Sequence, residues 1–492
     1  MTSDNPWDIG LKNGAPETGS GGTDFCLRYV LMLTSVAALG GVLFGYDWVV
    51  IGGAKPFYER YFQLSSDKLI GWANSCALLG CLLGSVASGA LSDRYGRKAL
   101  LIGSAALFTV SSVAAGWAYS FHTFILWRIA GGVAIGVASN VSPTYIAEIS
   151  PAPWRGRLIA VNQMGIAVGV LAAQVANYFI ADKVPQSATT EFIRQSWNGQ
   201  FGWRWMFSAV AIPSLIFLVG SIVLPESPRW MVANDKREGA RRTLTRIGGQ
   251  SYAEFELRDI KDTVAASGAG TWGDLLHPRI LGIVVIGMIL AALQQWVGIN
   301  VIFNYAEEIY RSAGFGVTDT LLNIVATGVI ALLSNILAFP LVDRFGRRPL
   351  MLFGCAGIGV FHVAIAITYR LGIKGLLPLS LTLAAIATYG LSLAPVTWIL
   401  IAEIFPTRVR GRAVAIAVSS LWIACFLVTF SFPFALNKIG VSGAFWFYAA
   451  ICFAGLLFVF RSIPETKGRS LEEIERQLAR RHHPLEVNIE RC

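Results

Sequence analysis

The chain has 492 residues, of which 54% are hydrophobic and only 14% are charged. A soluble globular protein carries about 25% charged residues, so this composition excludes an ordinary soluble domain and indicates an integral membrane protein. The net charge is +10, but the basic residues are not clustered in the way that a nucleic-acid-binding surface requires.

Long apolar runs follow one another along the whole chain. A membrane-spanning helix needs about 20 mostly apolar residues, and twelve such runs predict an all-α membrane fold of twelve transmembrane helices. The polar first 24 residues hold no apolar signal-peptide core, so we expect the first span to act as its own insertion signal. The twelve runs cover residues 29–53, 69–91, 98–119, 123–147, 158–181, 204–224, 280–304, 321–342, 349–370, 376–402, 413–434 and 442–463.

The basic residues predict how the chain is oriented in the membrane. If the N-terminus is cytoplasmic, 29 of the 40 Lys and Arg residues lie in the inner loops and tails, 10 lie in the outer loops, and Arg128 lies inside span 4. Such an excess of positive charge on one side is typical of cytoplasmic loops. We therefore predict a multi-pass protein of the cytoplasmic membrane with both termini inside the cell.

The sequence repeats itself, which indicates a duplicated six-span unit. Three segments of the first half have counterparts in the same order in the second half, at offsets of 239 to 255 residues. Such a molecule has a cavity between its halves, and rocking of the halves can open it to either side. The matched segments are GALSDRYGRKAL (89–100) with FPLVDRFGRRPL (339–350), AEISPAPWRGRLIAV (147–161) with AEIFPTRVRGRAVAI (402–416), and PESPR (225–229) with PETKG (464–468).

This duplication defines five predicted regions. Two six-span halves cover residues 29–224 and 280–463, and cytoplasmic tails cover residues 1–28 and 464–492. The linker between the halves, residues 225–279, has charges three or four positions apart, as in REGARRTLTRIG and AEFELRDIKDTVAA. That spacing predicts short amphipathic helices rather than a disordered linker.

An aspartate interrupts the first apolar run, in the stretch LFGYDWVVIGG (43–53). Ionisable residues inside membrane spans are costly and usually mark a function. Asp47 lies about 18 residues, or roughly 27 Å, from the inner end of span 1, and Arg128 lies at a similar depth in span 4. We therefore predict that Asp47 pairs with Arg128. If Arg128 moves between conformations, Asp47 can take up a proton in one and release it in another; the alternative is a purely structural ion pair.

Span 7 contains a cluster of amides in QQWVGIN (294–300). Gln294, Gln295 and Asn300 both donate and accept hydrogen bonds, which suits the hydroxyl groups of a sugar. Their spacing does not place all three on one face of a regular helix, so we expect local unwinding at Gly298. The alternative role for these amides is to hold helices together.

Taken together, the paired DRxGRR/K motifs, the two E-x₆-R motifs, PESPRW, QQWVGIN and PETKG resemble the sugar porter family of the major facilitator superfamily. The resemblance runs from about residue 28 to residue 475 and extends to bacterial proton–xylose symporters and facilitative glucose transporters. Proton-coupled members carry an aspartate at the place of Asp47, where facilitative animal glucose transporters usually carry asparagine. The resemblance therefore supports proton coupling.

The resemblance also implies a cytoplasmic gate of inter-helix salt bridges, which holds the inner side shut when the cavity faces outward. Semi-exposed ion pairs are individually weak, so such a network can be broken and remade. The residues that match the gate are Asp93, Arg97, Glu148, Arg155, Glu226, Arg229, Asp343, Arg347, Glu403, Arg410 and Glu465.

The same resemblance implies further sugar contacts, but several positions differ from the family pattern. The implied contacts are Gln163, Trp398 and Trp422, with Phe44 and Tyr389 as aromatic lining, and Gly390 and Pro395 flank a stretch where span 10 can break. Asn304 stands where many relatives carry tyrosine, and it joins the predicted contacts. Ala331, Leu421 and Val170 stand where various relatives carry amides, so the identity of the sugar stays open.

These observations predict a proton-coupled symporter for a hexose or a pentose. We expect its partners to be a monosaccharide, a proton and the lipid bilayer, and its working unit to be a monomer. We expect no cofactor, metal or nucleic acid to take part. The sequence holds no P-loop, which disfavours hydrolysis-driven pumping. A facilitative uniporter, a polyol or inositol transporter, and a non-transporting sugar receptor are the alternatives. An organic-acid carrier is disfavoured because Arg128 is the one mid-span basic residue evident.

Overall fold

The computed structural model describes residues 25–185, 188–266, 273–406 and 409–467. Within these ranges the chain is helical and has no strand. Eleven helical segments of the described chain are long and apolar enough to cross a membrane. The predicted all-helical membrane fold is confirmed. The predicted tails lie largely outside the described residues.

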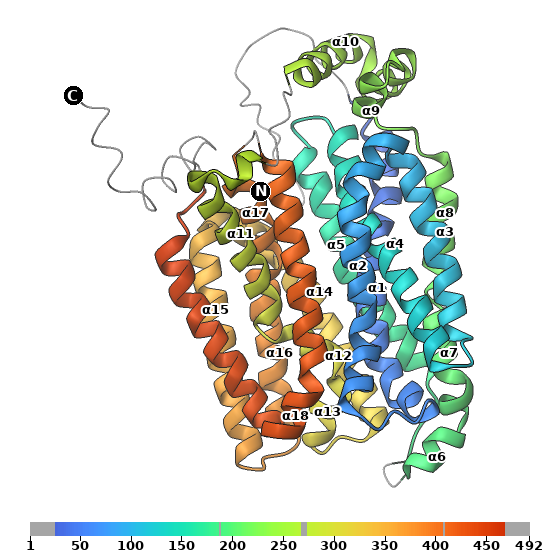
Figure 1. The fold of residues 1–492 in the computed structure, drawn as a ribbon, viewed down its shortest axis with the longest axis vertical. Coiled ribbons are helices and arrows are strands. Elements are labelled where there is room, and N and C mark those ends of the chain that lie inside the picture. Colours follow the sequence, from blue (N-terminus) through green and yellow to red (C-terminus); the bar gives the residue numbers. More distant parts are fainter. Residues whose placement is uncertain (1–24, 186–187, 267–272, 407–408, 468–492) are drawn as a thin grey trace, which may run out of the picture.

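The longest helix accounts for the difference between eleven segments and twelve predicted spans. α18 (Arg410–Ser462) contains 53 residues, and its backbone leaves helical geometry at Gly440, where φ is +67°. Glycine adopts this left-handed conformation without the steric cost that other residues incur. α18 therefore turns back at Gly440 and supplies two spans, which Figure 1 shows as two long red helices.

The helices before the linker form one group, which we call the first half (Figure 1, blue to green). α1 packs mainly on α5, α2 and α3 pack on α4, and α3 packs on α8. The elements are α1 (Leu27–Tyr61), α2 (Asp67–Tyr95), α3 (Arg97–Gly116), α4 (Phe121–Ile149), α5 (Arg155–Ile180), α6 (Thr190–Gln195), the π-helix η1 (Asn198–Gly202), α7 (Trp203–Ser208) and α8 (Ala211–Val223).

The helices after the linker form the second half (Figure 1, olive green to red). α15 and α11 pack on α18, and α15 also packs on α16. The elements are the 3₁₀-helix η2 (Gly273–Leu276), α11 (Pro278–Trp296), α12 (Ile299–Asn304), α13 (Ala306–Ser312), α14 (Val317–Phe345), α15 (Arg347–Arg370), α16 (Leu376–Leu391), α17 (Leu393–Ile404) and α18.

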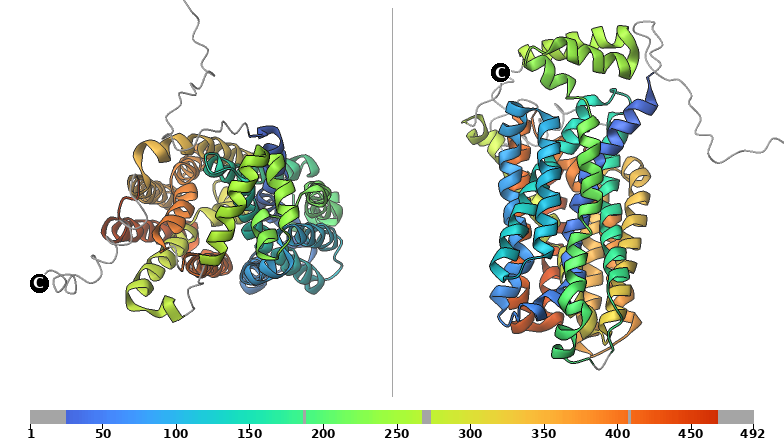
Figure 2. Two further views of the ribbon diagram at one scale, coloured as in Figure 1. Left: turned by 90° about the horizontal axis from the view of Figure 1, so that it is seen from above. Right: turned by 90° about the vertical axis from the view of Figure 1, so that its right-hand side faces the viewer.

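The linker forms helices, as its charge spacing predicts. α9 (Pro228–Ala233) and α10 (Arg237–Ala266) lie across one end of the bundle, at the top of Figure 1 and of the right-hand view of Figure 2. The Cys26 N–H donates to the Ile247 carbonyl over 2.8 Å, and the Phe25 and Tyr252 rings meet edge to face. α10 is thereby attached to the start of α1. We call this end the inner end and the opposite end the outer end, following the predicted orientation.

Close packing of α1 on α5 explains why residue 45, in the FGYD stretch, is glycine. A Cβ atom added to Gly45 would lie 1.9 Å from the Ile166 carbonyl oxygen, so a larger residue would push the two helices apart. Glycine at this position brings α1 directly against the backbone of α5, two residues before Asp47. The contact thus holds α1 against α5 close to Asp47.

α1 is longer than the predicted first span, which ends at residue 53. The helix continues to Tyr61, so Lys55 and Arg60 lie in a helix and not in the predicted outer loop. Lys55 is fully buried. The sequence prediction was wrong here because a lysine after an apolar run suggests a loop, whereas carboxylates from the second half compensate its charge.

The two halves meet where α2 packs on α18, where α5 packs on α14, and where α1 packs on α12 and α13. Polar contacts also join the halves towards the outer end, among them three hydrogen bonds. They are Asn437 Nδ2 to Asp67 Oδ1 (2.5 Å), the Val184 N–H to Thr318 Oγ1 (3.0 Å) and Gln174 Nε2 to Thr327 Oγ1 (3.2 Å).

Candidate functional site

A buried ion pair joins α1 to α4 inside the first half. Arg128 Nη1 donates to Asp47 Oδ1 over 2.6 Å, and each residue is only 5% exposed. The Arg128 guanidinium also lies over the Phe207 ring, 5.3 Å from its centre. An unpaired charge at this depth would be costly, so each side chain stabilises the other. The two side chains meet as their predicted depth requires, and proton coupling by them stays a prediction.

A cavity of about 110 Å³ lies between the two halves. Its lining combines amides with aromatic rings, which is the chemistry expected of a sugar site: amides bind hydroxyl groups, and rings cover the C–H faces. Val170, Ala331 and Leu421 also line it, so the departures from the family pattern bear on this cavity. Seven predicted sugar contacts line the cavity: Phe44, Gln163, Gln294, Gln295, Asn300, Tyr389 and Trp398.

The span 7 amides lie together because the helix breaks where the sequence predicts. α11 ends at Trp296, and Gly298 has φ +86° before α12 begins. Gln295 Nε2 donates to Gln294 Oε1 over 2.8 Å, and Asn300 Nδ2 donates to Gln295 Oε1. The break brings Asn300 back to Gln295 and produces a continuous row of amides on the cavity wall.

Span 10 also breaks, between the two residues predicted to flank the break. α16 ends at Leu391, Ser392 has φ −132° and ψ −88°, and α17 begins at Leu393. Tyr389 lies before the break and Trp398 lies after it, and both line the cavity. The predicted break between Gly390 and Pro395 is confirmed.

Two predicted sugar contacts lie elsewhere. Asn304 and Trp422 line a second cavity of about 20 Å³, next to Asp47 and Arg128. The rings of Phe44, Trp48 and Trp422 lie together, with centres 5.2 to 6.1 Å apart. Phe44 and Trp48 line both cavities, so they separate the ion pair from the larger one.

Trp48, Asn74 and Asn335 are among the lining residues that the sequence prediction missed. Trp48 lines both cavities and lies four residues after Phe44, on the same face of α1. This helical spacing is a signal that could have identified it. Asn74, a polar residue inside an apolar span, lines the smaller cavity, and Asn335 lines the larger one. Within the described ranges, no group of three His, Cys, Asp or Glu side chains is placed to hold a metal ion.

A sequence profile described as "Sugar (and other) transporter" matches residues 33–478. The chain belongs to this sugar transporter family. The glucose transport protein of Synechocystis sp. is 37% identical to this sugar transporter over 461 residues, which cover 91% of the chain and 97% of the relative. The D-xylose-proton symporter of Escherichia coli is 35% identical over 484 residues, covering 92% and 96%.

The solved structures agree with the family. The inward-open structure of the xylose transporter XylE from E. coli matches this sugar transporter with a TM-score of 0.80 and 34% identity, over 91% of this chain and 100% of that one. The fold is therefore that of the major facilitator superfamily.

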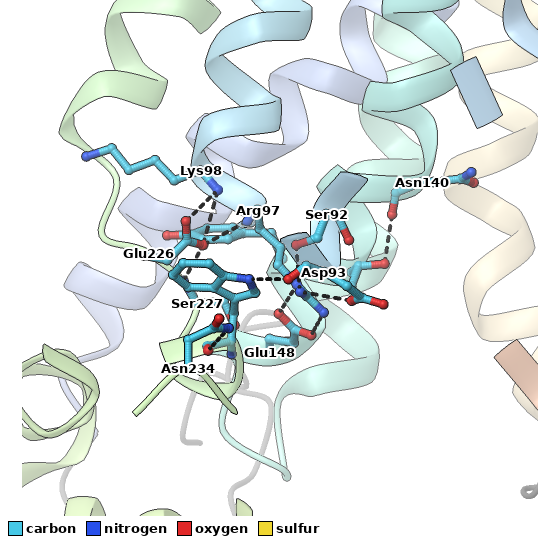
Figure 3. Close-up of polar contacts among 12 residues, drawn as sticks. Ser92, Asp93, Arg97, Lys98, Asn140, Glu148, Glu226, Ser227 and Asn234 are labelled. Carbon is cyan, nitrogen blue, oxygen red and sulfur yellow. Dashed lines mark hydrogen bonds and ion pairs between the residues drawn. The ribbon is translucent and has the colours of Figure 1, made fainter. Parts of the chain in front are cut away.

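At the inner end of the sugar transporter, a first inner cluster consists of Asp93, Arg97, Glu148 and Glu226 (Figure 3). Arg97 Nε and Nη2 donate to the two carboxylate oxygens of Glu148, both over 3.0 Å, and Arg97 Nη1 lies 3.3 Å from Asp93 Oδ1. Glu226 accepts the backbone N–H groups of Arg97 (2.9 Å) and Lys98 (3.2 Å) at the start of α3. A carboxylate is favourable at a helix N-terminus, so Glu226 stabilises this corner.

A second inner cluster, Asp343, Arg347, Glu403 and Glu465, repeats this arrangement in the other half. Arg347 Nη2 donates to Glu403 Oε1 over 3.1 Å, and Arg347 Nη1 lies 4.0 Å from Asp343 Oδ1. Glu465 accepts the backbone N–H groups of Arg347 (3.0 Å) and Arg348 (3.1 Å) at the start of α15. The sequence repeat thus has a counterpart in three dimensions.

Three arginines predicted for the gate lie outside these clusters. Arg410 Nε donates to the Phe405 carbonyl over 3.2 Å, and Arg229 is exposed. Arg155 lies near Glu256 of α10. Burial raises the pKa of the Glu256 carboxyl, and the positive charge of Arg155 opposes that rise. The glutamates of the E-x₆-R motifs instead bind the arginines of the DRxGRR/K motifs.

Proposed function

We propose that this sugar transporter is a proton-coupled monosaccharide symporter, which carries a hexose or a pentose by alternating access between two six-span halves. The observation that carries the proposal is the buried Asp47–Arg128 pair next to an amide-lined cavity. Phe44 and Trp48, on either side of Asp47 in the sequence, line that cavity. A change in the ion pair can therefore move the side chains that form the cavity wall.

Sugar binding is supported by the chemistry of the larger cavity. Gln163 from the first half faces Gln294, Gln295 and Asn300 from the second half across one space. A sugar held by amides of both halves favours the conformation in which the halves are close. Trp398 and Tyr389 offer aromatic faces for the C–H surface of the ring.

Proton coupling is supported by the charge balance of the ion pair. While Asp47 is ionised, it holds Arg128, and both charges are cancelled. A proton on Asp47 removes its negative charge and weakens that hold, which permits the halves to rock inward. Sugar and proton then leave to the inside, and Asp47 pairs with Arg128 again.

The gate proposal is supported by where the ion pairs lie. Arg97–Glu148 and Arg347–Glu403 each lie within one half, whereas the contacts Asp67–Asn437 and Gln174–Thr327 join the halves towards the outer end. This arrangement is what an inward-facing conformation requires. We propose that the two inner clusters, with Arg155, Arg229 and Arg410, form contacts between the halves when the cavity faces outward.

The remaining elements of the proposal concern location and partners. We propose a multi-pass protein of the cell membrane with both termini in the cytoplasm and a single chain as the working unit. The excess of Lys and Arg in the predicted inner loops supports this orientation.

Replacing Asp47 by asparagine tests the proposal. Asp47→Asn keeps the shape of the side chain but removes the titratable group. In membrane vesicles we expect the variant to exchange sugar in counterflow at a rate near that of the wild type, but no longer to concentrate sugar against a gradient. Accumulation by Asp47→Asn that equals wild-type accumulation would show that Asp47 is structural and the proposal is wrong.

A further inference from the structure

A second buried cation lies in α1, two helical turns beyond Asp47. Lys55 has no exposed surface, although it stands in a helix that crosses the membrane. Lysine is almost never fully buried unless it is paired, because removing an ammonium group from water is costly. Its partners therefore show what this part of the transporter does.

The partners of Lys55 come from both halves of the molecule. Lys55 Nζ donates to Glu308 Oε1 on α13 and lies 3.1 Å from Glu59 Oε1 on its own helix. It also lies over the Tyr305 ring, 5.2 Å from the centre. A second pair crosses the same boundary, because Arg60 Nη2 donates to Glu307 Oε1 over 3.0 Å. We call Lys55, Glu59, Arg60, Glu307 and Glu308 the outer cluster.

The outer cluster contains three carboxylates and only two cations. No side chain of the cluster is more than 23% exposed, so if every group were ionised, one surplus negative charge would lie in a largely buried region. Glu308 Oε2 is buried and accepts no hydrogen bond from the described residues, so the second oxygen of this carboxylate has no donor. A buried charge without compensation is strongly unfavourable, and a carboxylate in that position binds a proton instead.

The neighbouring titratable groups do not compensate the surplus charge. Tyr58 and Tyr305 interact electrostatically with Glu59 and Glu308, and a protonated tyrosine carries no charge that could compensate the surplus. The Tyr305 hydroxyl already donates to the Thr429 carbonyl over 2.7 Å. Arg128, which acts on Tyr58, is paired with Asp47.

Opening of the outer end would remove the need for that proton. Separation of the halves breaks Lys55–Glu308 and Arg60–Glu307, because each joins α1 to α13, and it leaves Lys55 with Glu59 on one helix. Water then reaches the separated carboxylates and stabilises their ionised forms. The closed outer end therefore holds one proton more than the open one.

We infer that the outer cluster is a proton-binding external gate, which takes up one proton from the outer solution when the two halves close over the cavity. The proton forms an O–H bond on the carboxylate of Glu59 or Glu308, and no other bond is made or broken. It returns to the outer solution when the gate opens. The proton of the outer cluster is thus separate from the proton that Asp47 is proposed to carry inward. This inference rests on the proposed orientation and alternating access, but not on proton coupling by Asp47.

Spin-label distances across the outer end test this inference on the full-length transporter in lipid nanodiscs. Labels at Tyr119→Cys and Leu371→Cys report the distance between the halves, because both positions are exposed loop residues at that end. The exposed Cys26 and the C-terminal Cys492 are replaced by serine. We expect the short-distance population to grow as the pH falls from 8 to 5. One linked proton changes the ratio of closed to open molecules by at most about tenfold per pH unit.

Glu59→Gln is the decisive variant, because it removes the surplus charge and leaves the pairs Lys55–Glu308 and Arg60–Glu307 in place. We expect it to remain closed across the whole pH range. The matched control is Glu191→Gln, which lies at the same end but pairs with Arg194 of its own half, and which should keep the wild-type pH response. Lys55→Met leaves Glu59 and Glu308 without their cation, so its closed population should appear only at lower pH.

Three results would overturn the inference. A wild-type distance distribution that is the same at pH 5 and pH 8 would show that closure takes up no proton. A Glu59→Gln variant with the wild-type pH response would place the proton outside the cluster. A response that disappears in Asp47→Asn would assign it to Asp47, whereas its survival in that background supports the outer cluster.

Discussion

Single side chains decide where charge can exist inside this transporter. Asp47 and Arg128 could be predicted as partners from the sequence, because they are opposite charges at similar predicted depths in spans 1 and 4. The pairing of Lys55 could not be predicted in the same way. Its partner Glu308 lies 253 positions later and reaches it only because α13 of the other half packs on α1.

Removing one partner of the Asp47–Arg128 pair should destabilise the fold more than removing both charges. Arg128→Leu leaves an uncompensated buried carboxylate, which costs about 3–5 kcal/mol of unfolding free energy. The double variant Asp47→Asn with Arg128→Leu should recover part of that loss, which thermal unfolding of the purified protein can measure. A double variant that is less stable than Arg128→Leu alone would argue against the ion pair as the stabilising contact.

A cavity amide should contribute directly to sugar affinity. Gln295→Ala removes hydrogen-bonding capacity and leaves Asn300 and Gln294 without a partner in the amide row, so we expect KM for the sugar to rise about tenfold, or roughly 1.4 kcal/mol. Gln200→Ala is the matched control, because Gln200 bonds to the Arg194 carbonyl outside the cavity. Equal KM values for the two variants would contradict the assignment of the cavity.

At the scale of helices, breaks in two spans shape the cavity. The sequence indicated both breaks, through Gly298 in span 7 and through Gly390 and Pro395 in span 10. It did not indicate which residues would face which cavity. The backbone at Gly298 changes the direction of α12 relative to α11, and Asn304 consequently lines the smaller cavity beside Asp47. A helical projection from a regular span cannot reproduce such a change of direction.

Alanine at Gly298 should weaken the break. The position has φ +86°, which costs an L-residue roughly 1–2 kcal/mol, and a Cβ there would lie 2.7 Å from the Tyr448 ring. We expect a lower unfolding temperature and weaker sugar binding for Gly298→Ala. Gly282→Ala in α11 is the control, since nothing lies within 4 Å of a Cβ at that position. If both variants unfold at the wild-type temperature, the left-handed turn is not required.

At the scale of the whole molecule, the twelve spans and their duplication follow from hydropathy and repeated motifs. The conformation does not follow from them, because the proposed alternating-access cycle requires the same sequence to form two states. The contacts between α1 and α13 and between α2 and α18 select the state closed towards the outer end. The inner clusters, which resemblance assigns to a gate, lie within each half in this state.

The most direct test of the proposed function is the pH of a weakly buffered outer solution when sugar is added to vesicles that contain the transporter. Because one proton is proposed to enter with each sugar, we expect the outer solution to become alkaline as sugar is taken up by the wild type. The Asp47→Asn variant should show no such change. Sugar uptake by the wild type without alkalinisation outside would contradict proton coupling and leave facilitated uniport as the function.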